Sequence, residues 1–144
     1  MKREWRQGEF VISTDPARLD VERVYRYLAH ESYWAIGRPQ AMIERSIANS
    51  LVFGIYKGNQ QAGFCRVVTD YATFAWLCDV FVLEPFRRLG LSKWMMEVVT
   101  SHSDLQGLRR WMLGTKDAQE LYRQYGFTEA DSLVRWMERV TELA

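Results

Sequence analysis

The stretch from Asp79 to Lys93 constrains the fold of this chain more than any other part of its 144 residues. It reads DVFVLEPFRRLGLSK: an apolar run, a proline, a basic turn that contains Gly90, and then residues with helical periodicity. That order predicts a strand, a turn and a helix. Backbone N–H groups at the start of a helix are unpaired, and a turn with little side-chain bulk lets them converge on an anion. The sequence therefore predicts a phosphate-binding turn, with Arg87 and Arg88 adding positive charge at its mouth.

Length and composition are those of a single globular domain, which we expect to span residues 1–144. Hydrophobic residues make up 48% and charged residues 26% of the chain, a balance that excludes a disordered protein. The 19 Lys and Arg residues nearly cancel the 18 Asp and Glu residues, so no overall charge would attract nucleic acid. Any anion site must therefore be local.

Cysteine use and hydropathy predict a soluble, cytoplasmic protein. Cys65 and Cys78 lie in apolar runs and are expected to be free thiols, as in a reducing compartment. The N-terminal residues lack the apolar segment of a signal peptide, and no run approaches the ~20 apolar residues of a membrane span. No metal site is predicted, because the few Cys and His residues do not have ligand spacing.

The hydrophobic pattern predicts an α+β fold in which strands outnumber helices. Alternating runs indicate strands, and apolar residues at i, i+3, i+4 and i+7 indicate helices. The expected strands are 10–13, 51–57, 60–69, 73–83, 109–114 and 132–140, and the expected helices lie near 21–28, 42–47, 91–98 and 117–125. Asp117 and Glu120 have the spacing of a capping box. A hairpin sheet followed by a strand-helix-strand-helix unit gives a mixed sheet of six to seven strands with helices on both faces.

A second motif follows the first at the spacing of one helix and one strand. It is Ala118-x-x-x-Tyr122-x-x-x-Gly126-Phe127, after Arg87-x-x-Gly90-x-Ser92. Together, in this order, they resemble the GCN5-related N-acetyltransferase (GNAT) superfamily. The resemblance implies acetyl-CoA as co-substrate, a sheet splayed at the acetyl-CoA strand, and a tyrosine beside the thioester sulfur. Ser92 stands where the family has Gly or Ala, but it is small and its hydroxyl could contact a phosphate.

The resemblance also implies which residues bind acetyl-CoA and which take part in the chemistry. The backbone of Val80, Phe81 and Val82 would pair with the pantetheine arm as an added strand. The pyrophosphate would be held by the turn that comprises Arg87, Arg88, Leu89, Gly90, Leu91, Ser92 and Lys93. Tyr122 would protonate the departing thiolate, and Asp79 would hold the acceptor ammonium and accept its proton.

The acceptor side is specified by fewer residues. In the superfamily the first two helices and their loop cover the acceptor, which makes Trp34 a substrate-binding candidate beside Asp79. Aromatic walls around one carboxylate would suit a cationic amine. Arg38 could instead bind an acceptor carboxylate, which would indicate an amino acid or peptide. Asp79 could also be a structural carboxylate bonded to a neighbouring loop.

The predicted function is that of an N-acetyltransferase that moves an acetyl group directly from acetyl-CoA to a primary amine. A small-molecule or amino-acid-like acceptor is expected, and a protein or peptide amino group is the alternative. A non-catalytic module that senses acyl-CoA is the alternative from another class. The protein would act as a monomer or a homodimer, without nucleic acid, membrane or metal.

Overall fold

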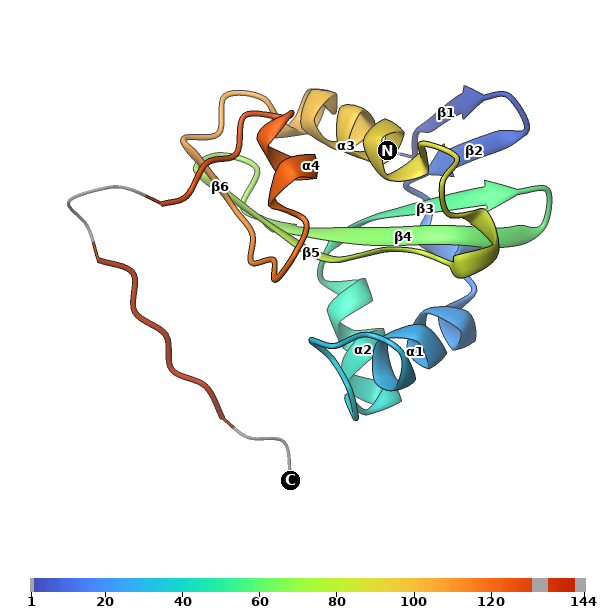
Figure 1. Cartoon of the computed structure of the whole chain (residues 1–144), viewed down its shortest axis with the longest axis horizontal. Helices are drawn as coiled ribbons and strands as arrows, with labels where there is room; N and C mark the ends of the chain where they lie inside the picture. Colours follow the sequence, from blue (N-terminus) through green and yellow to red (C-terminus); the bar gives the residue numbers. More distant parts are fainter. Residues whose placement is uncertain (1, 131–134, 142–144) are drawn as a thin grey trace.

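A six-stranded mixed sheet forms the centre of the protein in the computed structural model, which describes residues 2–130 and 135–141. The strand order is β1-β2-β3-β4-β5-β6 (Figure 1). The strands are β1 (Glu4–Gln7), β2 (Phe10–Ser13), β3 (Leu51–Lys57), β4 (Gln60–Thr69), β5 (Phe74–Val82) and β6 (Arg110–Met112). Strands β1 to β5 pair antiparallel, whereas β5 and β6 are parallel. The predicted mixed α+β sheet is thus confirmed.

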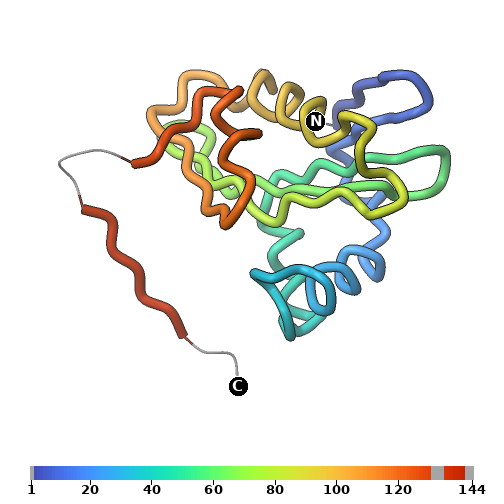
Figure 2. Tube along the Cα trace, in the orientation of Figure 1, coloured from blue at the N-terminus to red at the C-terminus, as the bar shows by residue number. Residues whose placement is uncertain are grey.

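Helices cover both faces of the sheet, as the sequence predicts. Figures 1 and 2 show α1 and α2 on one face and α3 and α4 on the other. The helices are α1 (Val21–His30), α2 (Gln40–Ala48), α3 (Leu91–Ser101) and α4 (Gln119–Arg123). Helix α1 begins at Asp20, whose side chain accepts a hydrogen bond from the Arg23 N–H and so satisfies one of the unpaired N–H groups of the first turn.

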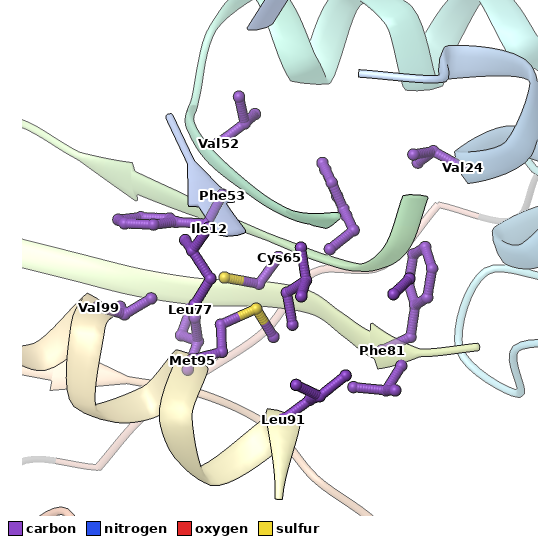
Figure 3. Close-up of a cluster of buried hydrophobic side chains, with 14 of the residues drawn as sticks. Ile12, Val24, Val52, Phe53, Cys65, Leu77, Phe81, Leu91, Met95 and Val99 are labelled. Carbon is purple, nitrogen blue, oxygen red and sulfur yellow. The ribbon is translucent and has the colours of Figure 1, made fainter. Parts of the chain in front are cut away.

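Helix α3 is fixed against the sheet by apolar side chains four residues apart. Leu91, Met95 and Val99 are buried along one side of the helix, and Figure 3 shows them on the side that faces the sheet, with Met95 near Leu77 and Leu91 toward Phe81. Each such side chain stabilises the fold by roughly 1.5–3 kcal/mol when fully buried. Because Leu91 is the first residue of the helix, this packing also fixes the helix start relative to β5.

In the part of the chain that the structure describes, one edge of the C-terminal half of strand β5 has no partner strand. It pairs with β4 up to Val82, but it pairs with β6 only from Phe74 to Trp76. The ladder with β4 is also irregular, because Phe64 opposes Phe81 whereas Arg66 opposes Cys78. One extra residue therefore sits on β5 at this point, a β-bulge that includes Asp79 at a left-handed φ of 54°. The two parallel strands separate beyond Trp76, which is the splay that the family resemblance implies.

Some local elements differ from the sequence expectations. Strand β1 was not predicted, because its residues EWRQ are mostly polar and exposed and so do not alternate in hydrophobicity. Strand β6 is shorter than the predicted 109–114. Helix α4 begins after Ala118 without a side-chain cap, and the Ala118 N–H instead donates to the Thr115 hydroxyl. The predicted capping box of Asp117 and Glu120 is therefore wrong.

The predicted last strand, 132–140, is also wrong where it can be compared. Residues 132–134 lie outside the described residues, and 135–140 belong to no strand. Both alternating rows of this segment mix charged and apolar side chains, so neither row favours burial against the sheet. The Arg110 guanidinium lies over the ring of Trp136, 4.6 Å from its centroid.

His102 is a buried polar group beneath the first strands. Its ring lies 5.8 Å from the rings of Trp5 and Phe53. Its Nδ1 accepts a hydrogen bond from the Asp104 N–H, so the neutral ring carries its proton on Nε2, which has no partner among the described residues. Burial lowers the pKa of His102 because the charged imidazolium would lose its hydration.

This burial predicts a pH-dependent stability. As the pH falls below about 6.5, the unfolded chain takes up a proton on His102 that the folded protein excludes, so stability falls until the lowered pKa of the folded state is reached. Thermal unfolding would be measured between pH 8 and pH 5. His102→Asn is the matched control, since its amide oxygen can accept from the Asp104 N–H and does not titrate. An equal loss of stability in both proteins would contradict the assignment.

Candidate functional site

The free edge of β5 presents backbone groups of Val80 and Val82. The Leu83 N–H donates to the Ala62 carbonyl on β4, at 2.8 Å. Alternate residues of a strand direct their peptide groups to the same side, so those of Phe81 also face β4 and those of Val80 and Val82 face the opening. The Arg87 Nε donates to the Val82 carbonyl at 2.9 Å. The edge therefore offers the N–H and C=O of Val80 and the N–H of Val82.

Phe81 lies differently from its two neighbours. Its side chain is buried and stacks on Tyr27 of α1, with ring centroids 4.1 Å apart. Its peptide groups are directed to the β4 partner strand. Phe81 therefore holds the strand in place from behind and does not share the free edge that the sequence analysis gave to all three residues.

The turn before α3 carries a run of unpaired backbone donors. The first helical hydrogen bond runs from the Trp94 N–H to the Gly90 carbonyl, and no N–H group from Arg88 to Lys93 donates to an acceptor among the described residues. Arg88 and Gly90 have left-handed φ angles of 65° and 77°. Alternation of such residues with ordinary ones makes a concave row of N–H groups that suits an anion, with the positive end of the helix dipole behind it.

The side chains of this turn leave the concave row open. Arg87, Arg88 and Leu89 are exposed, and a Cβ at Gly90 would meet nothing within 4 Å. Leu91 points into the core, Ser92 is half-buried and Lys93 is exposed. All seven residues predicted for pyrophosphate binding thus lie in one continuous turn that adjoins the free edge of β5.

Asp79 is the centre of a polar cluster. Its Oδ2 accepts from the Arg66 Nε at 2.6 Å and from the Arg38 Nη1 at 3.1 Å. Its Oδ1 accepts from the Trp34 Nε1 at 2.8 Å and from the same Arg38 nitrogen at 3.3 Å. Arg66 also donates to the Ser50 hydroxyl at 3.3 Å. The structure therefore brings Trp34 and Asp79 together, and it adds two guanidinium groups to them.

The exposed charge of this cluster is positive. The Asp79 side chain is 3% exposed, whereas those of Arg38 and Arg66 are 18% and 15% exposed. Two guanidinium groups and one carboxylate leave a net charge of +1. The pKa of Cys78 is raised to about 11, mainly by burial, so its thiol stays protonated beside these charges. A ligand that reaches the cluster from solvent meets cations and not the carboxylate.

Tyr122 is a buried tyrosine with an uncommitted hydroxyl. It lies in α4, and burial raises its pKa to about 12. Its hydroxyl makes no hydrogen bond to the described residues, so it is a neutral donor that is free to turn toward a ligand. Tyr125 differs, since its hydroxyl donates to the Lys93 carbonyl at 2.9 Å and ties the segment after α4 to α3.

The loop between α1 and α2 reaches across the splay. The Tyr33 hydroxyl accepts a hydrogen bond from the Lys116 N–H at 2.9 Å, and the next residue, Trp34, contacts Asp79 on β5. One loop thus touches both sides of the opening between β5 and the segment that follows β6. This contact places the Asp79 cluster and the Tyr33 ring at the same opening.

A cavity of about 760 Å³ lies elsewhere, between β6, α4 and Trp136. Its lining includes Met112 and Tyr122 but no residue of β5 or of the turn before α3. It therefore shares only Tyr122 with the predicted site.

The structure is that of an α+β protein in which an unpaired strand edge leads to a helix start with unpaired N–H groups among the described residues. The chain matches the family model of the acetyltransferase (GNAT) domain over residues 48–129. A curated acetyltransferase relative from Gibberella zeae is 30% identical over 140 residues, covering 82% of this chain and 78% of that protein. A solved structure from Xanthomonas campestris pv. campestris, described as a GNAT-family acetyltransferase, has a TM-score of 0.87 and 46% identity, covering 92% of this chain and 93% of that one.

The chain therefore belongs to the GNAT family of acetyltransferases, whose general reaction is N-acetyl transfer. A GNAT structure from Elizabethkingia anophelis with acetyl-CoA bound has the same fold, with a TM-score of 0.65 and 16% identity over 87% of this chain and 80% of that one.

The sequence analysis did not select Arg66 or Tyr33 for the site. Arg66 is the one charged residue within the strand predicted at 60–69, and a charge in an otherwise apolar strand was a usable signal. Nothing in the sequence joins Tyr33 to Lys116, 83 positions away. Within the described ranges, no cluster of three metal-ligating side chains is found, and no helix has the length and hydropathy of a membrane span.

Proposed function

We propose that the protein transfers an acetyl group from acetyl-CoA directly to a primary amine of a small molecule. The observation that carries the proposal is that the open edge of β5 leads to six consecutive N–H groups, from Arg88 to Lys93, with no acceptor among the described residues. An extended amide chain that ends in phosphates matches this sequence of donors, first as an added strand and then as an anion. The acetyl-CoA bound to the Elizabethkingia anophelis relative supports the same co-substrate.

In this proposal the backbone of Val80 and Val82 holds the pantetheine arm, and the N–H groups from Arg88 to Lys93 hold the pyrophosphate. Arg87 holds the Val82 carbonyl through a hydrogen bond, and its positive charge at the rim of the turn attracts the phosphates. Phe81 contributes packing in place of the predicted backbone pairing. Acetyl-CoA, when bound, supplies an activated acyl thioester.

The chemistry needs a donor at the carbonyl oxygen and a donor at the leaving sulfur. The Val80 N–H, which faces the opening beside the bulge, polarises the carbonyl as the neutral amine attacks the carbonyl carbon. The C–N bond forms and the C–S bond breaks. Tyr122 donates its hydroxyl proton to the departing sulfur, which leaves as the CoA thiol. The attacking nitrogen loses one proton to solvent, and the Tyr122 oxygen takes a proton back from solvent, so the enzyme returns to its starting state.

The role of Asp79 changes from the one predicted. Both carboxylate oxygens already accept hydrogen bonds from cationic or indole donors, and almost none of the side chain is exposed. A carboxylate held in this way is a poor site for an incoming ammonium. We therefore propose that Asp79 is a positioning residue that orients Arg38, Arg66 and Trp34 at the acceptor opening.

The free thiols of Cys65 and Cys78 support a reducing compartment, and we propose a single cytoplasmic domain. A monomer and a homodimer both fit this proposal, and light scattering distinguishes them by mass.

Gly90→Glu tests the anion site. The carboxylate would be placed at the N-cap of α3 beside the six N–H groups, where it competes with the pyrophosphate, so acetyl-CoA should bind at least tenfold more weakly, a loss of about 1.4 kcal/mol. Calorimetry would measure the affinity. Gly90→Asn is the matched control, because Asn tolerates a left-handed φ and carries no charge. Equal affinities of the wild type and Gly90→Glu for acetyl-CoA would contradict the anion site.

The alternative function is distinguished by turnover. If the wild-type protein binds acetyl-CoA tightly but acetylates no amine, it is an acyl-CoA sensor and not an enzyme.

A further inference from the structure

The polar cluster around Asp79 has an exposed charge opposite to the one that a simple amine would need. Its carboxylate is closed off, and the surface left to solvent belongs to the guanidinium groups of Arg38 and Arg66. Arg38 uses one nitrogen for both of its bonds to Asp79, and its Nε and Nη2 make no hydrogen bond to the described residues. Planar guanidinium donors of this kind bind the two oxygens of a carboxylate through paired, charge-assisted hydrogen bonds.

The positive charge of this cluster lies next to the strand edge where acetyl transfer is proposed. Asp79 directly precedes Val80, whose N–H and C=O face the opening in β5, so the guanidinium groups lie within one residue of the edge where transfer is proposed. An anionic group on the acceptor would therefore sit close to its reacting nitrogen.

An apolar surface continues from the cluster along the same face of the sheet. Arg66 opposes Cys78, and two residues further along the ladder Val68 opposes Trp76. Alternate residues share a face, so these four side chains lie together. Val68 and Trp76 are 40% and 41% exposed, which is high for apolar side chains on a sheet face. Trp76 stands about 7 Å along the strand from Cys78, within reach of a side chain on a ligand held at Arg66.

From this juxtaposition we propose that the acceptor is an amino carboxylic acid with an apolar or aromatic side chain. Arg38 and Arg66 bind its carboxylate, the amine is directed to the Val80 edge, and the side chain covers Trp76 and Val68. The inference rests on the proposed acetyl transfer and narrows it, since an acceptor without a nearby carboxylate, such as a lysine side chain in a protein, leaves the cationic surface unpaired.

The test compares acceptors that differ only in the carboxylate. L-phenylalanine and 2-phenylethylamine form one pair, and L-tryptophan and tryptamine form another. CoA release gives kcat/KM, corrected for the fraction of free amine, and calorimetry on the CoA-loaded protein gives affinity without turnover. The acid of each pair should be preferred roughly 10- to 100-fold, the effect of one charge-assisted contact. The inference would be overturned if the decarboxylated amines, or a peptide amine, had kcat/KM values and affinities equal to or better than those of the amino acids. Acetyl transfer itself would still stand in that case.

Variants separate substrate recognition from general damage. Arg38→Gln should remove most of the preference for the acid by raising its KM, with the KM of the decarboxylated amine unchanged, and Arg38→Lys should restore part of it. Arg45→Gln is the matched control on the exposed surface of α2 and should keep the preference.

Trp76→Ala tests the apolar surface. In the wild type kcat/KM for phenylalanine should exceed that for glycine on the order of tenfold, and this ratio should fall in Trp76→Ala. An unchanged acid preference in Arg38→Gln would refute the carboxylate site. If the wild-type protein does not bind acetyl-CoA at all, the proposed function itself is refuted.

Discussion

Replacement of Asp79 by alanine is expected to destabilise the folded protein by roughly 3–4 kcal/mol. The change leaves the guanidinium groups of Arg38 and Arg66 without their shared anion while they are still mostly buried. It also places alanine at a φ of 54°, a conformation that Asp adopts more readily than Ala. Urea unfolding at constant pH would measure the loss. A cost below about 1 kcal/mol would show that the cluster is not a structural unit.

Asp79→Asn separates the structural role of this residue from a catalytic one. Asn tolerates the left-handed conformation and keeps one oxygen acceptor, so the fold should survive with a smaller loss of stability. If Asp79 is a positioning residue, acetyl-CoA affinity stays unchanged, the KM of the acceptor rises, and kcat falls by less than about tenfold. A fall in kcat of about a thousandfold in a stable protein that binds acetyl-CoA normally would instead make Asp79 the base, as the sequence first suggested.

Tyr122→Phe is expected to lower kcat by about 10²–10³, the size of a lost proton donor, with little effect on acetyl-CoA affinity. The Tyr122 side chain is buried, and its hydroxyl has no hydrogen-bond partner in the described structure, so loss of the hydroxyl leaves no protein group unpaired. Steady-state CoA release and calorimetry measure the two quantities. Turnover that is unchanged in Tyr122→Phe would remove Tyr122 from the mechanism.

Tyr125→Phe is the matched control, because Tyr125 follows on the same segment and its hydroxyl binds the Lys93 carbonyl instead of a ligand. It should lose about 1 kcal/mol of stability and keep kcat. The pH profile gives a second readout. Since the pKa of Tyr122 is about 12, kcat/KM of the wild type should rise as the amine loses its proton and show no falling limb below about pH 11. A falling limb near neutral pH that Tyr122→Phe abolishes would contradict this assignment.

The segment that is proposed to bind acetyl-CoA could be recognised because it is local in sequence. Strand β5, the turn that contains Gly90 and the start of α3 are consecutive, and each follows from nearby residues: apolar runs, one glycine and helical spacing. The structure adds that Arg88 is also left-handed, that the peptide groups of Phe81 face β4, and that a one-residue bulge interrupts the ladder at Asp79. A pattern of side-chain types does not reveal a bulge of this kind.

The acceptor side could be predicted only in part because its contacts are remote. Asp79 and Trp34 were recognised separately, but their hydrogen bond spans 45 positions, and the partner Arg66 comes from a different strand. The sequence also leaves the sign of the exposed charge open. It depends on which members of the cluster are closed off, and that is a property of packing.

The sequence by itself predicted the α+β class, most of the elements in their order, and the strand-turn-helix segment that contains Gly90, because hydrophobic periodicity and glycine placement act over a few residues. Only the tertiary structure decided three other features. One edge of β5 has no partner strand in the described part of the chain, the Asp79 carboxylate is paired with Arg38 and Arg66, and the exposed surface of this cluster consists of guanidinium groups. These features depend on strand pairing and on side-chain burial between residues 13 to 83 positions apart, where chain folding and not local preference sets the distances.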